Sequence, residues 1–290
     1  MKICGFYGVT LRASFESGVS LSCDWVCEFF VTKSRLYTRI LNKMWEKAPE
    51  EALQVKRLLD LHGVSEGSCI LDLGCGTGRI AVNLAKLGYR VVGVDISPGF
   101  IEEAKKRARE HSVEDRVEFY VGDARRIDEI FSESSFDAVL LYWSTILGYY
   151  LDENVDLEIL RRTRRITKPG GHLLVLNTAS YDKSAVATAL LGTPARYFEE
   201  IDDEVVCVKT TLFDPAKSLL TLTWTFYRRA GRDLVYIDEV TAKMRIYTLH
   251  ELVKLAEQAG WVYIAAYRDL KTLEPYTPLF SGLNAVFKAQ

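Results

Sequence analysis

Hydrophobic and polar positions alternate along the chain in a way that predicts strands and helices in turn. Short apolar runs predict buried strands at 69–73, 90–95, 117–121, 136–142 and 172–177. Apolar residues at helical spacing predict helices between them, at 80–87, 97–111 and 157–167. Because strands and helices repeat with short connections, we expect a parallel sheet covered on both faces. The pattern therefore predicts a doubly wound α/β fold.

The first 48 residues follow another pattern, which predicts a tail and a helical cap. Residues 1–22 show no clear period, whereas apolar residues from Asp24 to Lys47 form one helical stripe. A second helix begins at Pro49, where proline suits the first turn, and ends at Gly63. We expect the main domain to cover 49–179 and 247–290.

A third pattern, between 180 and 246, predicts an inserted antiparallel sheet. Runs rich in Val, Thr and aromatic residues predict strands at 204–213, 219–228 and 235–247, with turns between them. The α/β pattern resumes at Thr248, where a capping box with Glu251 begins a helix. Strands are predicted at 261–267 and 285–288. Because the insert follows the fifth strand, we expect it to form a lid over a substrate pocket.

Composition narrows the function classes. The 290 residues are 48% hydrophobic and 26% charged, with a net charge of −2, which gives no general attraction to nucleic acid. No segment has the roughly 20 apolar residues of a membrane span, so we expect a cytoplasmic protein. The composition does not decide the oligomeric state, and a homodimer is one alternative. The six cysteines suggest mostly buried reduced thiols, with a disulfide among Cys4, Cys23 and Cys27 as the alternative.

Acidic residues end three neighbouring predicted strands, and glycines follow the first of them. Asp72 precedes the run Gly74-Cys75-Gly76-Thr77-Gly78, Asp95 ends the second strand, and Asp123 follows the third. A glycine turn between a strand and a helix lets the backbone approach a ligand closely. A carboxylate can accept hydrogen bonds from both hydroxyls of a ribose. These strand ends therefore predict a cofactor site.

Two cofactors compete for this site. Residues 76–81 also fit the G-x-G-x-x-A fingerprint of NAD(P)-dependent oxidoreductases. Asp72 beside the glycines would repel a pyrophosphate but attract an ammonium group. Asp123 has no role in the dinucleotide scheme. We therefore favour a cofactor that carries an amino acid and a nucleoside.

These residues resemble the class I S-adenosylmethionine-dependent methyltransferases, especially their small-molecule branch, over about residues 50–180 and 247–290. The resemblance implies a seven-stranded Rossmann-like sheet whose last strand is antiparallel. It implies that Asp72 holds the amino acid end of the cofactor, Asp95 the ribose, and Asp123 with Ala124 the adenine, on which Ile96 packs. It places Leu141 and Tyr142 near the sulfonium. The implied cofactor site comprises Asp72, Gly74, Cys75, Gly76, Gly78, Asp95, Ile96, Gly122, Asp123, Ala124, Leu141 and Tyr142.

The acceptor is less well defined. Aromatic residues follow the fourth strand, and we single out Tyr142 as a catalytic residue because of its position in the motif. No His, Cys and carboxylate cluster has metal-ligand spacing. The acidic run 199–204 is interpreted as a solvated loop or as a surface that attracts a cationic acceptor. The sequence favours N- or O-methylation of a small molecule, with RNA or protein methylation as the alternative.

Overall fold

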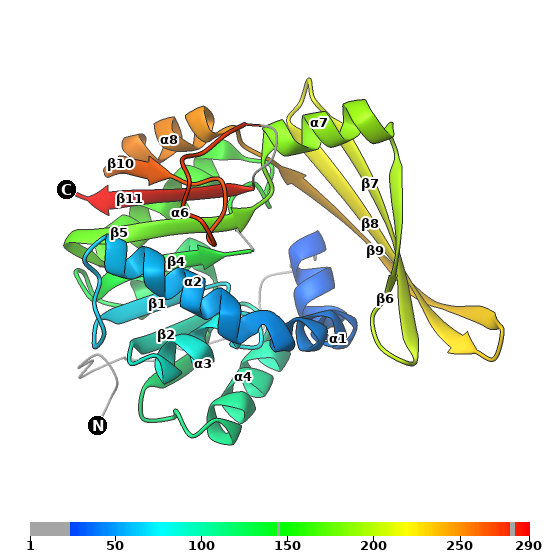
Figure 1. Ribbon diagram of the computed structural model, residues 1–290, viewed down its shortest axis with the longest axis horizontal. Coiled ribbons are helices and arrows are strands. Elements are labelled where there is room, and N and C mark those ends of the chain that lie inside the picture. The colour runs from blue at the N-terminus through cyan, green and yellow to red at the C-terminus, as the bar shows by residue number, and fades with distance from the viewer. Residues whose placement is uncertain (1–23, 144–145, 279–281) are drawn as a thin grey trace.

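The computed structural model describes residues 24–143, 146–278 and 282–290. It has two sheets with short helices between them (Figure 1). Residues 1–22, predicted to be a tail, lie outside the described residues, as do Cys4 and Cys23. Cys75 and Cys207 are buried free thiols, as expected, whereas Cys69 is disulfide-bonded, which its spacing did not predict.

The main sheet has seven strands in the order β10-β11-β5-β4-β1-β2-β3. Strands β1 to β5 run parallel, and β11 runs antiparallel to both of its neighbours, as the resemblance implied. The strands are β1 (Cys69–Leu73), β2 (Arg90–Asp95), β3 (Val117–Val121), β4 (Phe136–Tyr142), β5 (Thr167–Thr178), β10 (Trp261–Ala266) and β11 (Leu283–Ala289).

Helices cover both faces of this sheet because the strands are apolar on both sides. One core contains apolar residues of α2 (Ala48–Leu61), α3 (Arg79–Lys86) and α4 (Pro98–Glu110). The other contains residues of α5 (Ile127–Ile130), α6 (Glu153–Ile166) and α8 (Leu249–Gln258). Local signals position these helices: Ser97 caps α4, and the predicted capping box of Thr248 and Glu251 begins α8.

Two boundaries in the main domain differ from the prediction. Helix α6 begins at Glu153 because Asp152 caps it, accepting from the backbone of Asn154. Strand β5 begins at Thr167 and includes the glycine-rich stretch predicted as a turn. The register between β4 and β5 shifts there, from the pair Phe136–Thr167 to the pair Ala138–His172. The extra residues form an irregularity inside the strand, which local composition did not distinguish from a turn.

The insert is more complex than predicted. It begins with a helix, α7 (Tyr181–Leu191), and has four antiparallel strands: β6 (Ala195–Glu200), β7 (Val205–Asp214), β8 (Leu219–Ala230) and β9 (Asp233–Arg245). Helix α7 was missed because it buries no residue and so shows no apolar stripe. Strand β6 was missed because it is the edge strand and its residues are mostly exposed.

The predicted N-terminal helix is divided into three helical segments of different pitch. A π-helix (Cys27–Thr32) precedes α1 (Ser34–Lys43), and a 3₁₀ turn (Met44–Lys47) joins it to α2. This segment, the cap, lies between the main sheet and the insert (Figure 1). Phe29 and Ile40 of the cap form a core with the insert residues Val205, Cys207 and Phe226.

The acidic run links the insert to the cap through ion pairs at the surface. Lys43 of α1 pairs with Glu199, and Arg39 of α1 pairs with Asp202 and Glu204. Glu199 also pairs with Lys209. Asp202, Asp203 and Glu204 remain exposed, which agrees with the interpretation of the run as a solvated loop.

Candidate active site

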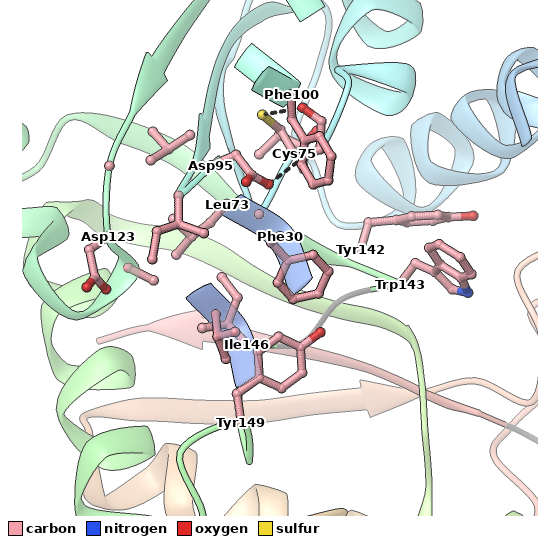
Figure 2. Close-up of a pocket in the computed structure, with 18 of the residues that line it drawn as sticks. Phe30, Leu73, Cys75, Asp95, Phe100, Asp123, Tyr142, Trp143, Ile146 and Tyr149 are labelled. Carbon is pink, nitrogen blue, oxygen red and sulfur yellow. Dashed lines mark hydrogen bonds between the residues drawn. The ribbon is translucent and has the colours of Figure 1, made fainter. Parts of the chain in front are cut away.

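The carboxyl ends of β1, β2 and β3 line one pocket together with the cap. Asp72 and Leu73 come from β1, Val94 and Asp95 from β2, and Gly122 and Asp123 from the turn after β3. Val26, Phe30, Tyr37 and Leu41 of the cap segment close the pocket from the other side. Figure 2 shows Asp95 and Asp123 on one side of this pocket and Tyr142 and Trp143 on the other.

The glycine turn after β1 positions the pocket floor. Gly74, Gly76 and Gly78 have φ angles of 78°, 55° and 77°, a left-handed conformation that favours glycine. The backbone N–H of Gly74 donates to the carbonyl of Val94 at 2.8 Å, which ties the turn to β2. A Cβ on Gly78 would lie 2.8 Å from the Phe119 ring, so this glycine permits close packing. Gly78 does not line the pocket, although the resemblance placed it there.

Asp95 is held in place by the glycine turn and by the start of α4. Its Oδ2 accepts from the backbone N–H of Gly76 at 2.9 Å, and its Oδ1 accepts from that of Ser97 at 2.9 Å. Each oxygen keeps a second lone pair for a ligand. Burial raises the pKa of Asp95 to about 6, against the backbone hydrogen bonds that lower it.

Asp72 is a buried carboxyl group at the end of β1, with a side chain only 2% exposed. Burial raises its pKa to about 7, which nearby Asp95 also raises and nearby Arg79 lowers. Two buried carboxyl groups with raised pKa values mark a site that is short of positive charge, because Arg79, the cation among its described lining residues, is paired with Glu51. A ligand that brings an ammonium group would supply it, whereas a diphosphate would not.

Asp123 already has a partner. Its carboxylate accepts from the Arg125 guanidinium, with Nη2 to Oδ2 at 2.6 Å, and from the Arg125 backbone N–H at 2.9 Å. The guanidinium lies 4.3 Å from the centre of the Tyr150 ring, which also lines the pocket. An adenine amine that binds Asp123 must therefore share this carboxylate with Arg125.

The fourth strand contributes one of its two predicted residues. Tyr142 lines the pocket, but Leu141 is fully buried in the core on the α6 and α8 face. Leu141 and Tyr142 point to opposite faces of β4, and only the Tyr142 side chain lines the pocket. The remaining predicted residues Cys75, Ile96 and Ala124 line the pocket.

Arg79 is a pocket residue that sequence reasoning missed. It begins α3, is 4% exposed, and pairs with Glu51 of α2. Its guanidinium lies 5.2 Å from the centre of the Tyr142 ring and 5.5 Å from that of Trp143. Its place directly after the last glycine of the turn was the available signal. Phe30 and Tyr37 were seen only as part of an aromatic helix.

A second, larger cavity of about 580 Å³ adjoins the first. It lies between the insert sheet, α7, the cap and the end of β5. Four aromatic residues line both cavities, and we call them the aromatic wall: Phe30, Tyr37, Trp143 and Tyr149. The indole N–H of Trp25 donates to the carbonyl of Tyr149 at 3.0 Å and so joins the cap to this wall.

The histidines and the arginine run lie outside this site. The ring of His172 lies 5.8 Å from that of His62 of the α2 C-cap, and neither residue lines the two cavities. On α6, Arg162 pairs with Asp128, Glu129 and Glu158, and Arg165 pairs with Asp128. In the part of the chain that the structure describes, no helix is long and apolar enough to cross a membrane.

Comparison with known proteins indicates the class of enzyme to which this fold and pocket correspond. Residues 70–171 match the sequence profile of a methyltransferase domain. The chain therefore contains a methyltransferase domain over these residues, and its fold is that of solved S-adenosylmethionine-dependent methyltransferases.

Two relatives illustrate the range of similarity. Methyltransferase GfsG from Streptomyces halstedii is 32% identical over 197 residues, which are 66% of this chain and 62% of that protein. A solved S-adenosylmethionine-dependent methyltransferase from Clostridium acetobutylicum has a TM-score of 0.69 and 16% identity, covering 89% of this chain and 98% of the other. The chain spans roughly half to two thirds of the length of the first curated relatives it matches.

Proposed function

We propose that this protein transfers a methyl group from S-adenosylmethionine to a small-molecule acceptor. One observation carries the proposal: the pocket with the buried carboxyl groups and the larger cavity share the aromatic wall. A methyl donor in the first and an acceptor in the second would meet there. A transfer reaction needs its two partners in contact and shielded from water, and this arrangement provides both.

The residues present fit the proposed cofactor. Asp72 would hold its ammonium group, because the buried carboxyl lacks a full counter-charge. Asp95 would hold the ribose hydroxyls with the lone pairs left by Gly76 and Ser97. Ile96, Asp123 and Ala124 would surround the adenine.

The cofactor supplies an activated methyl group on a positive sulfonium, and the protein supplies its surroundings. Aromatic faces attract a cation, so the wall would stabilise the sulfonium and orient it toward the cavity. The cap covers the pocket with Phe30 and Tyr37, which excludes water from the reacting atoms.

We also propose a main domain at 49–179 and 247–290 and a substrate-binding insert at 180–246.

Relatives support a small acceptor. GfsG is named a methyltransferase, and another relative is a ubiquinone biosynthesis O-methyltransferase from Xanthomonas oryzae. A structure of similar fold is that of CalS10, an amino pentose methyltransferase from Micromonospora echinaspora, with S-adenosylmethionine bound. A cavity of about 580 Å³ suits a small molecule better than a duplex or a protein surface.

Two measurements test the proposal. Calorimetry should show binding of S-adenosylmethionine and S-adenosylhomocysteine with one site per chain. A screen of small phenols, amines and acids should then release S-adenosylhomocysteine with at least one acceptor. Absence of cofactor binding would contradict the proposal, as would methylation of RNA or protein when a broad panel of small acceptors gives none.

A further inference from the structure

The floor of the larger cavity is one face of the insert sheet. Leu222 on β8 and Ala242 and Met244 on β9 line the cavity. Thr223 and Thr241, which alternate with them, do not line it, and their hydroxyls hydrogen-bond each other at 2.9 Å. Because side chains alternate across a strand, this sheet presents a mainly apolar face to the cavity, with Thr211 of β7 beside Leu222, and the hydroxyls of Thr223 and Thr241 to the opposite side.

This apolar face is packed at both ends and open in the middle. Toward the cap, Val205, Cys207 and Phe226 pack with Phe29 and Ile40. At the other end, Phe213 and Ile246 form a second small core, on which Tyr181 and Ala185 of α7 pack. The middle of the face therefore stays available to a ligand, between two fixed ends.

Few charges reach the cavity. Among the described residues that line it, the charged ones are Glu51, Lys183 and Arg245. Glu51 pairs with Arg79, and Arg245 pairs with Glu153 and Glu251. Lys183 lies on the exposed first turn of α7. A phosphorylated acceptor needs several converging cations or backbone donors, and the described lining offers one exposed lysine.

We propose that the acceptor is an uncharged molecule with an apolar, ring-containing body that lies on Leu222, Ala242 and Met244. Its nucleophilic atom would face the aromatic wall. This inference rests on the proposed function and adds the chemical class of the acceptor. It separates an apolar acceptor from a nucleotide-linked sugar, whose diphosphate the described lining does not match.

A neutral fluorescent probe tests the proposal without knowledge of the true acceptor. N-phenyl-1-naphthylamine is titrated into the full chain saturated with S-adenosylhomocysteine. We expect a saturable rise in fluorescence with one site per chain, and no competition from thymidine diphosphate glucose. Leu222→Asp should weaken probe binding at least tenfold, because it places a charge on the cavity floor. Thr223→Asp, its neighbour on the polar face, should leave probe binding within twofold.

Two further measurements keep the outcome interpretable. Affinity for S-adenosylhomocysteine, measured by calorimetry, should be unchanged in both variants, which shows that they are folded and that the proposed function stands apart from this test. Ala242→Phe should block the probe by filling the cavity, without introducing a charge. The proposal is overturned if the probe shows no saturable site, if both aspartate variants bind it equally, or if thymidine diphosphate glucose displaces it.

Discussion

The side-chain amide of Asn177 donates a 2.8 Å hydrogen bond to the hydroxyl of Tyr142, which joins the ends of β5 and β4 at the boundary of the two cavities. Burial raises the pKa of Tyr142, and the carboxylate of Glu51, to which the hydroxyl also hydrogen-bonds, raises it further. The hydroxyl therefore stays protonated at neutral pH. We expect it to position neighbouring groups and not to remove a proton.

Replacing Tyr142 with Phe tests this role. The variant keeps the ring against Arg79 but releases Asn177 and Glu51, so turnover should fall about tenfold, the equivalent of one hydrogen bond to a charged group. Affinity for S-adenosylhomocysteine should stay within about twofold, because the ring still lines the pocket. Tyr120→Phe, which removes a hydroxyl bonded to Glu118, is the control. Unchanged turnover would mean that the Tyr142 ring only packs.

Replacing Asp95 with Ala should weaken S-adenosylmethionine binding by roughly 1.5–3 kcal/mol, because charged hydrogen bonds to the ribose are lost. Calorimetry measures the difference directly. Asp115→Ala, at an exposed position, should bind as the unmodified chain does. Full affinity in a folded Asp95→Ala variant would sink the assignment of Asp95 to the ribose.

The raised pKa of Asp72 predicts pH-dependent cofactor binding. With a pKa of about 7, this carboxyl is partly protonated near neutral pH, and a bound ammonium favours its ionised form. Affinity should therefore fall as the pH drops below 7. At pH 6.5, binding should release roughly three quarters of a proton, seen as a dependence of the calorimetric heat on the buffer. Asp72→Asn should lose this dependence; a buffer-independent heat in the unmodified chain would contradict the account.

The same residue should cost stability in the absence of cofactor. A carboxyl group whose pKa is higher in the folded than in the unfolded chain destabilises the fold above both values, and the penalty disappears as the pH falls toward 4. Asp72→Asn should thus raise the free energy of unfolding at pH 8 by roughly 1–3 kcal/mol. Urea denaturation at pH 8 and pH 5 measures it. An equal effect at both pH values would exclude ionisation as the cause.

The reaction should not need a metal ion. In the described ranges, no group of three His, Cys, Asp or Glu residues is arranged to hold one. Turnover of the purified protein should be the same before and after treatment with a chelator. Loss of turnover that a divalent ion restores would refute this prediction.

Sequence patterns predicted the parts of this fold that depend on local signals. The apolar runs from 69 to 73 and from 136 to 142 match β1 and β4 in full, because buried parallel strands need nearly continuous apolar residues. The cap of Ser97 and the box of Thr248 fixed two helix starts. Helix α7 has no apolar stripe, so its pattern could not predict a helix.

In the candidate site, too, most of the residues that local signals mark were predicted, and those that depend on tertiary packing were not. Asp72, Asp95 and Asp123 were predicted because they occupy strand ends in a known order. Leu141 was predicted only from the resemblance, and the structure buries its side chain among residues of α6 and α8. Phe30 and Tyr37 reach the pocket through tertiary packing of the cap, which no local pattern encodes, whereas the position of Arg79 after the last glycine was a local signal. The pairing of Asp123 with Arg125 also needed the structure.

A crystal structure with bound S-adenosylhomocysteine tests the central claim most directly. The account predicts ribose hydroxyls on Asp95, the ammonium group beside Asp72, and the sulfur facing Phe30, Tyr37, Trp143 and Tyr149, toward the larger cavity. A ligand bound elsewhere, or with its sulfur turned away from that wall, would contradict it.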